Sequence, residues 1–140
     1  MNHQLRIIKN FAPLLLKKNN LISIETEGIF GEKFTIIQKD KNWCFGFLNE
    51  DKYQGWLKSN SIGTMEKPNF IVNVPKTLIL RSPDVKSIPI DHLSIGSHVY
   101  VKKFIDVWAE ISFLKKNILI DGYVHKFHLQ AISTPNQDWI

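Results

Sequence analysis

Short apolar segments separated by polar turns recur along the chain. Many of them are rich in β-branched and aromatic residues, and the stretches between them carry Lys, Asp, Asn and Gly. This is the pattern of β-strands joined by tight turns. We predict strands over 12–17, 32–38, 43–48 and 53–57, a short one near Ile62, and further strands over 77–81, 98–104, 107–113 and 118–125. The pattern predicts an all-β fold.

The segment before residue 12 is ambiguous. Leu5, Ile7 and Ile8 have spacings found on one face of a helix, but Pro13 interrupts any helix that continues past it. We expect a strand over 12–17 and leave a short helix over 3–10 open.

The pattern of the chain occurs twice. Gly31 and Trp43 recur as Gly96 and Trp108, a shift of 65 residues. Upstream of these residues LLLKKNN matches LILRSPD, and downstream GWL matches GYV. A unit of this length is too long for a solenoid repeat and is the size of a small domain.

The repeat predicts two small domains in tandem. The first spans 1–63 with its lead-in, a linker spans 64–72, the second domain spans 73–132, and a tail spans 133–140. A domain of about 60 residues buries only a thin core and is marginally stable alone.

The segment 43–48 shows which strand face points inward. Alternation separates Trp43, Phe45 and Phe47 from Cys44 and Gly46. The second copy has Glu and Ser where the first has the two Phe residues, but Ala and Ile at the positions of Cys44 and Gly46. A core face must be apolar in both copies, so we predict that Cys44 and Gly46 face inward. Phe45 then lies outside, either as a docking surface or as a cap on the end of the barrel.

Charge and hydropathy narrow the function classes. The net charge is +5, but the lysines are scattered, which does not favour a nucleic-acid partner. No apolar run approaches the roughly 20 residues of a membrane span, and the amino terminus lacks a secretory signal pattern. We therefore expect a cytoplasmic protein without a membrane partner.

Few residues of the sequence could carry thiol chemistry or bind a metal. Cys44 is the only cysteine, so no intrachain disulfide can form, and its inward position indicates a core thiol. His125 and His128 are three residues apart but lack a frame of further ligands. We expect no metal and no cofactor.

Two motifs carry a family resemblance. The pattern Gly-x11-Trp, followed by a polar turn and then Gly-Trp-Leu or Gly-Tyr-Val, resembles bacterial SH3-like (SH3b) domains. The pair of copies, with EDKYQGW at 50–56 and LSIGS at 93–97, is similar to the amino-terminal half of NlpC/P60 cysteine peptidases, which trim cell-wall peptides. The resemblance covers about residues 12–132 and implies two tandem SH3-like small β-barrels.

The resemblance implies a peptidase whose catalytic part is absent here. In that family a catalytic domain with a Cys nucleophile and a His base follows the second SH3 domain. Cys44 lies in the middle of a predicted strand and does not match this nucleophile, so we expect no catalytic residue in this chain. The implied partners are a carboxy-terminal NlpC/P60 catalytic domain and a muropeptide substrate, cleaved by an endopeptidase of the γ-D-glutamyl-diamino acid type.

The resemblance also implies a substrate-binding role for the stretch 51–56. In the family, the first SH3 domain closes the end of the peptide site, where an acidic side chain and a Tyr hydroxyl meet the free amine of the substrate. We therefore predict that Asp51 and Tyr53 select a free amino-terminal L-Ala, with Trp56 as packing support. The alternative is a turn aspartate and a barrel tyrosine, with Lys52 neutralising Asp51.

Two other function classes remain open. A free-standing SH3-like module would bind a peptide or the cell wall on an aromatic groove formed from Phe45, Tyr53, Trp56 and Tyr100. A basic barrel with stacking aromatics would bind RNA, with a steep salt dependence. The scattered lysines make RNA the least favoured of the three.

Overall fold

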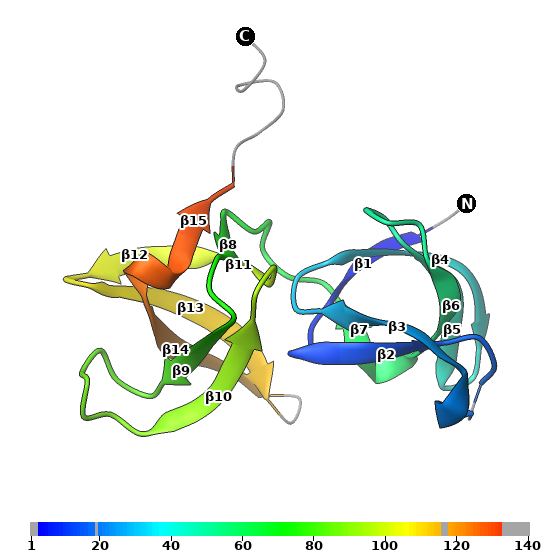
Figure 1. Cartoon of the computed structure of the whole chain (residues 1–140), viewed down its shortest axis with the longest axis horizontal. Coiled ribbons are helices and arrows are strands. Elements are labelled where there is room, and N and C mark those ends of the chain that lie inside the picture. Colours follow the sequence, from blue (N-terminus) through cyan, green and yellow to red (C-terminus); the bar gives the residue numbers. More distant parts are fainter. Residues whose placement is uncertain (1–2, 19, 116–117, 133–140) are drawn as a thin grey trace, which may run out of the picture. The chain divides into compact units, whose positions relative to one another are not determined.

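The computed structural model describes residues 3–18, 20–115 and 118–132, so the expected tail over 133–140 lies outside the described residues. The chain divides into two compact units, Met1–Met65 and Glu66–Ile140 (Figure 1). In the described part of the chain every regular element is a β-strand or a single turn of 3-10 helix. The predicted all-β fold class is confirmed.

The first unit is one antiparallel sheet of seven strands, in the order β3-β2-β6-β5-β4-β1-β7. In Figure 1 this sheet curls round on itself. Its elements are β1 (His3–Ile7), β2 (Phe11–Leu15), η1 (Leu21–Ser23), β3 (Ile24–Ile29), β4 (Lys33–Asp40), β5 (Trp43–Leu48), β6 (Gln54–Lys58), η2 (Ser59–Ser61) and β7 (Ile62–Gly63).

The core of the first unit lies inside the curled sheet. Its buried members are Ile7, Ala12, Leu14, Phe34, Ile36, Cys44, Leu48, Leu57 and Ile62. The predicted orientation of β5 is confirmed, because Cys44 and Gly46 are buried while Trp43, Phe45 and Phe47 are half-buried on the other face.

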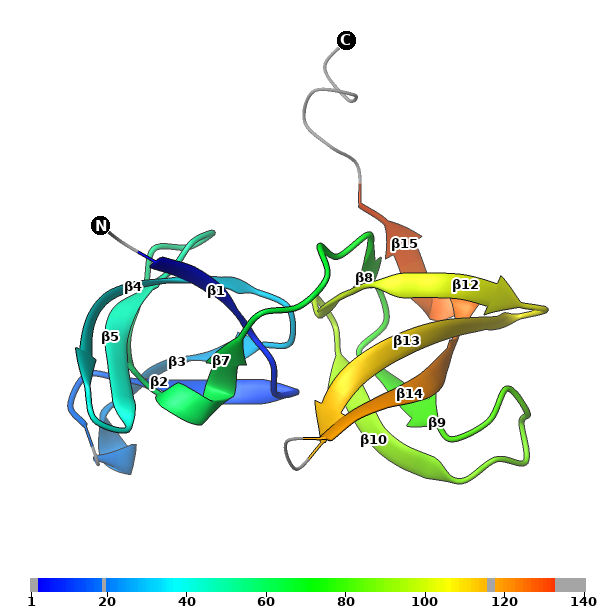
Figure 2. The same cartoon turned by 180° about the vertical axis from the view of Figure 1, so that it is seen from behind.

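The second unit contains a five-stranded antiparallel sheet, in the order β10-β9-β14-β13-β12, and a three-stranded one, in the order β11-β8-β15. Its elements are β8 (Phe70–Val72), β9 (Lys76–Leu80), β10 (Pro89–Ser94), β11 (His98–Val99), β12 (Val101–Ile105), β13 (Trp108–Lys115), β14 (Ile118–His125), η3 (Lys126–His128) and β15 (Leu129–Ala131). Figure 2 shows β12, β13 and β14 side by side and the loop from β9 to β10 projecting from the sheet.

The two units share strand pairings and turn conformations. In the first unit β1 pairs with both β4 and β7, and in the second β8 pairs with both β11 and β15. Gly31 and Gly96 have φ angles of 85° and 89°, and Lys41 and Asp106 have φ angles of 54° and 55°. Glycine adopts this left-handed conformation without a steric penalty, which accounts for its recurrence at the turn before β4 and β11.

Some elements differ from the sequence-based expectations. Residues 3–7, where a helix was left open, form strand β1, which is held in place by pairing with β4. Strands β3, β10 and β15 were not predicted. Residues 70–72, expected in the linker, form β8 and pair within the second unit.

Candidate functional site

The predicted site residues Asp51 and Tyr53 lie in the turn that joins β5 to β6. Two backbone hydrogen bonds close this turn: the Leu48 N–H donates to the Tyr53 carbonyl at 3.0 Å, and the Lys52 N–H donates to the Leu48 carbonyl at 2.9 Å. Lys52 adopts the left-handed conformation, with φ at 62°. The turn therefore has a defined, hydrogen-bonded backbone.

Neighbouring strands brace the start of the turn. The Asn49 N–H donates to the Lys33 carbonyl at 3.0 Å, and the Thr35 hydroxyl donates to the Asn49 side-chain oxygen at 2.9 Å. The turn is thereby tied to β4 as well as to β5 and β6.

The side chains of Asp51 and Tyr53 are both accessible to a ligand. Asp51 is exposed, and Tyr53 is 43% exposed. The Asp51 carboxylate is 3.5 Å from the Tyr53 N–H, a long contact that leaves the carboxylate free to accept stronger hydrogen bonds. This contact is the arrangement of a turn aspartate, so the geometry accommodates the structural role as well as the binding role.

Lys52 does not neutralise Asp51 by an ion pair. Among the ion pairs of the described residues, none joins these two side chains. The Lys52 ammonium instead lies 5.3 Å from the ring centroid of Phe47, in a cation–π arrangement.

Sequence reasoning missed an acidic residue near this turn, Glu32. Burial raises the pKa of Glu32, and the negative charges of Asp51 and Glu50 raise it further. The Ile29 N–H donates to the Glu32 carboxylate at 2.7 Å, and this hydrogen bond lowers the pKa. Two further carboxylates thus act on Glu32 at this end of the barrel, although the whole chain is basic. The available signal was the difference between the copies, because Gly31-Glu32 in the first is Gly96-Ser97 in the second.

Trp56 lies apart from the turn, on the outer face of β6. Its ring packs against Phe45, with 5.2 Å between the centroids, and the Lys18 ammonium lies 4.9 Å from the centroid of the Trp56 ring. Lys18 also bonds to the Asp40 carboxylate. These contacts are those of a packing residue of the first unit.

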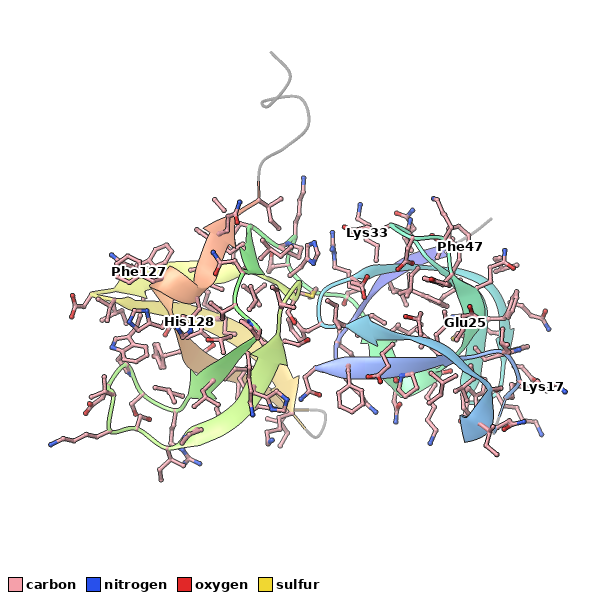
Figure 3. All side chains as sticks on the ribbon, in the orientation of Figure 1. Lys17, Glu25, Lys33, Phe47, Phe127 and His128 are labelled. Carbon is pink, nitrogen blue, oxygen red and sulfur yellow. The ribbon has the colours of Figure 1, made fainter. Side chains whose placement is uncertain are left out.

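A shallow hollow borders the same end of the first unit. It is lined by Gln4, Leu5, Arg6, Lys33, Gly63, Thr64 and Met65. Lys33, labelled in Figure 3, belongs both to this hollow and to the strand that braces the turn. The hollow and the turn are therefore linked through the backbone of Lys33.

The described residues offer neither a metal centre nor a membrane-spanning helix. Within 3–18, 20–115 and 118–132, no group of three or more His, Cys, Asp or Glu side chains is placed to hold a metal ion. Over the same residues, none of the helices has the length and apolar character needed to cross a membrane.

Comparison with known proteins connects the first unit to a family of bacterial domains. Residues 22–62 match the family described as the bacterial dipeptidyl-peptidase SH3 domain. This match includes the β5–β6 turn and Trp56. No curated protein matches the chain.

In its fold the chain resembles a solved structure of an NlpC/P60 family protein. An NlpC/P60 family protein from Bacillus cereus ATCC 10987 superposes with a TM-score of 0.74 at 13% sequence identity, covering 96% of this chain. NlpC2 and NlpC1 from Trichomonas vaginalis give TM-scores of 0.40 at 16% and 15% identity, each covering 93% of this chain. This chain spans 58% of the Bacillus cereus structure and 48% and 46% of the two others.

The comparisons and the geometry agree on the kind of domain. The β-strand architecture, the match over residues 22–62 and the likeness to the Bacillus cereus structure all indicate a bacterial SH3 domain. Over residues 22–62 the chain is thus similar to a bacterial SH3 domain, and its fold is similar to that of an NlpC/P60 family protein.

Proposed function

We propose that this chain is the non-catalytic SH3b region of an NlpC/P60-type endopeptidase of the γ-D-glutamyl-diamino acid type. Its role in that enzyme is to select muropeptides that carry a free amino-terminal L-Ala. The catalytic thiolate is supplied by a separate NlpC/P60 domain, because the one cysteine of this chain is buried at 3% exposure within the first unit.

The observation that carries the proposal is the β5–β6 turn. It holds an exposed carboxylate, Asp51, and an accessible phenol, Tyr53, two residues apart on a hydrogen-bonded backbone. A substrate ammonium loses water on binding, so it needs oxygen acceptors and a negative charge. The Asp51 carboxylate and the Tyr53 hydroxyl provide both.

The electrostatic surroundings support the same assignment. The negative charges of Asp51 and Glu50 both reach Glu32, whose pKa they raise. The negative charge of these carboxylates favours a cationic group over a neutral one, although Lys52 and the neighbouring Lys33 add positive charge to the same turn. An amino-blocked peptide lacks this charge and gains nothing from the attraction.

A free-standing binding module is less well supported. Its aromatic groove would include Phe45 and Trp56, but these half-buried rings pack against one another and Lys18 lies over Trp56. A ligand would have to displace this lysine before it could stack on the indole.

The test uses the 140-residue chain and a free dipeptide. Titration with L-Ala-γ-D-Glu, followed by amide NMR spectra, should shift the signals of Asp51 and Tyr53. N-acetyl-L-Ala-γ-D-Glu is the matched control and should leave them in place. Equal shifts with both peptides, or shifts confined to the second unit, would contradict recognition of the amine by this turn.

A further inference from the structure

A histidine side chain caps the last turn of the second unit. The 3-10 turn η3 spans Lys126–His128, and Nδ1 of His125 accepts the Phe127 N–H at 3.2 Å. Figure 3 labels Phe127 and His128 on this turn. Nδ1 can accept a hydrogen bond only when it carries no proton, so the cap requires a neutral His125 with its proton on Nε2.

The ring of His125 is surrounded by other rings. Its centroid lies 5.5 Å from that of Trp108 on β13, 5.4 Å from that of Phe127 and 5.1 Å from that of His128. Thr77 on β9 holds the second histidine, with 2.8 Å between its hydroxyl and Nδ1 of His128.

The charges near this pair do not favour a second positive group. From β13 and β9 the facing groups are the neutral Trp108 and Thr77. From η3 they are His128 itself and Lys126, whose ammonium lies 5.3 Å from the Phe127 ring. Burial lowers the pKa of His128, and the neighbouring His125 lowers it further. A positive charge at His125 therefore opposes protonation of His128.

We propose that His125 and His128 form an acid-sensitive latch on the end of the second unit. Protonation of His125 converts Nδ1 from acceptor to donor, so the Phe127 N–H loses its partner. The new charge also repels His128 when that ring is protonated. Both effects loosen η3 and the strand β15 that follows it.

The latch reaches β8 through two hydrogen-bonded connections. The His128 carbonyl accepts the Asn73 N–H at 2.9 Å, and β15 pairs with β8 from Leu129 opposite Val72 onward. Loosening η3 therefore weakens the edge of the three-stranded sheet, while the five-stranded sheet keeps its own pairings.

The direction of the pH effect follows because the cap requires a neutral imidazole. A histidine whose folded pKa is depressed below 6.5 makes the unfolded chain the stronger proton binder. The stability that His128 contributes is complete above its unfolded pKa and is lost as the pH falls through the folded pKa. The latch is closed at neutral pH and opens in acid.

The first unit supplies an internal control. There Trp43 pairs with Lys58, as Trp108 pairs with His125, and Lys58 precedes the 3-10 turn η2 without a side-chain cap. The Ser59 N–H of η2 donates to the Asn42 carbonyl at 2.8 Å. A turn of the same type in the same chain thus lacks the titrating cap.

The test compares amide protection factors in the full chain at pH 8 and pH 5. The protection factor of Phe127 should fall roughly fivefold in acid, the effect of losing a cap, while that of Ser59 stays constant. In His125→Asn, which keeps an uncharged acceptor at the cap, the acid response of Phe127 should be clearly smaller, because only His128 then gains a proton. Equal protection of Phe127 at both pH values, or an acid response in His125→Asn as large as that of the wild type, would overturn the latch.

A second measurement needs no variant. The imidazole signals of His125 and the amide signal of Phe127 should titrate with one common midpoint in the wild-type chain. Different midpoints would also overturn the proposal, even if His125→Asn did not fold.

Discussion

A Cβ atom at Gly46 would lie 1.9 Å from the carbonyl oxygen of Thr35. The backbone of β5 therefore approaches β4 more closely than a side chain permits, beside a register shift between Ile36 and Gln38. We predict that Gly46→Ala lowers the free energy of unfolding by about 3 kcal/mol, because the backbone of one strand has to move. Urea unfolding measures this loss.

Gly63→Ala is the matched control for that substitution. Its Cβ would meet the end of the flexible Ile8 side chain at 3.1 Å, which can move aside. Its loss of stability should be clearly smaller than that of Gly46→Ala, and equal losses would contradict the role of the close approach.

Tyr53→Phe and Asp51→Asn should each reduce discrimination between free and amino-blocked substrates in an enzyme that contains this chain and its catalytic domain. Each change removes one proposed ligand of the ammonium. Losing a hydrogen bond to a charged group costs about 1.5–3 kcal/mol, which corresponds to a roughly ten- to hundredfold change in kcat/KM. The ratio of kcat/KM for the two substrates is the quantity to measure.

Tyr123→Phe controls for removal of a tyrosine hydroxyl elsewhere. Tyr123 donates to Glu110 at 2.8 Å in the second unit, so its loss should leave the selectivity ratio unchanged. If Tyr53→Phe behaves like Tyr123→Phe, the amine-binding role of Tyr53 is wrong.

Trp56→Ala separates packing from binding. Loss of the ring contact with Phe45 should lower the free energy of unfolding by about 2 kcal/mol, a half-buried aromatic being worth less than a core one. At temperatures where the variant stays folded, the selectivity ratio should match that of the wild type. A folded variant with altered selectivity would make Trp56 a direct ligand.

Glu32→Gln should change how stability depends on pH. Because the folded pKa of Glu32 is raised above its ordinary value of 4.5, the unfolded chain loses this proton more readily. The stability linked to Glu32 is complete below the unfolded pKa and is lost as the pH rises through the folded pKa. The glutamine keeps an acceptor for the Ile29 N–H without the charge. The variant should therefore gain stability relative to the wild type as the pH rises from 4 to 7.

Parallel urea unfolding of wild type and Glu32→Gln at several pH values measures this difference. A difference that does not vary with pH would show that Glu32 ionises equally well in both states.

Cys44 should react with thiol reagents only when the first unit opens. Its side chain is 3% exposed, with Sγ 3.5 Å from the Ser59 hydroxyl, so a reagent cannot reach it in the folded state. Labelling of the native chain should be slow and should accelerate on addition of urea. Rapid stoichiometric labelling without urea would contradict the assignment of a core thiol.

The strands with regular patterns were predictable from the sequence. Trp43–Leu48 and Ile118–His125 have the bounds that alternation and turn residues indicate. The buried face of β5 also followed from the sequence, because a position that is apolar in both copies is a core position.

The edge strands were not predictable in the same way. Strands β3 and β10 each lie at an end of their sheet and pair irregularly with one neighbour, with register shifts at Leu14/Leu15 and Pro89/Asp91. An edge strand buries little, so its sequence carries many polar residues and no clean alternation. Glu32 was missed for a different reason, since the influence of Asp51 on its pKa depends on two turns that are distant in sequence.

The pairing of β1 with β7 has an evolutionary consequence. Arg6 pairs with Gly63 and Ile7 with Ile62, so the chain enters and leaves the first barrel at neighbouring strands, as Figures 1 and 2 both show. A module whose entry and exit are adjacent can be duplicated or inserted into another gene without rethreading its sheet. The same geometry in β8 and β15 makes each barrel a unit that can be duplicated or moved as a whole. A turn in one copy can then change while the other copy keeps its scaffold.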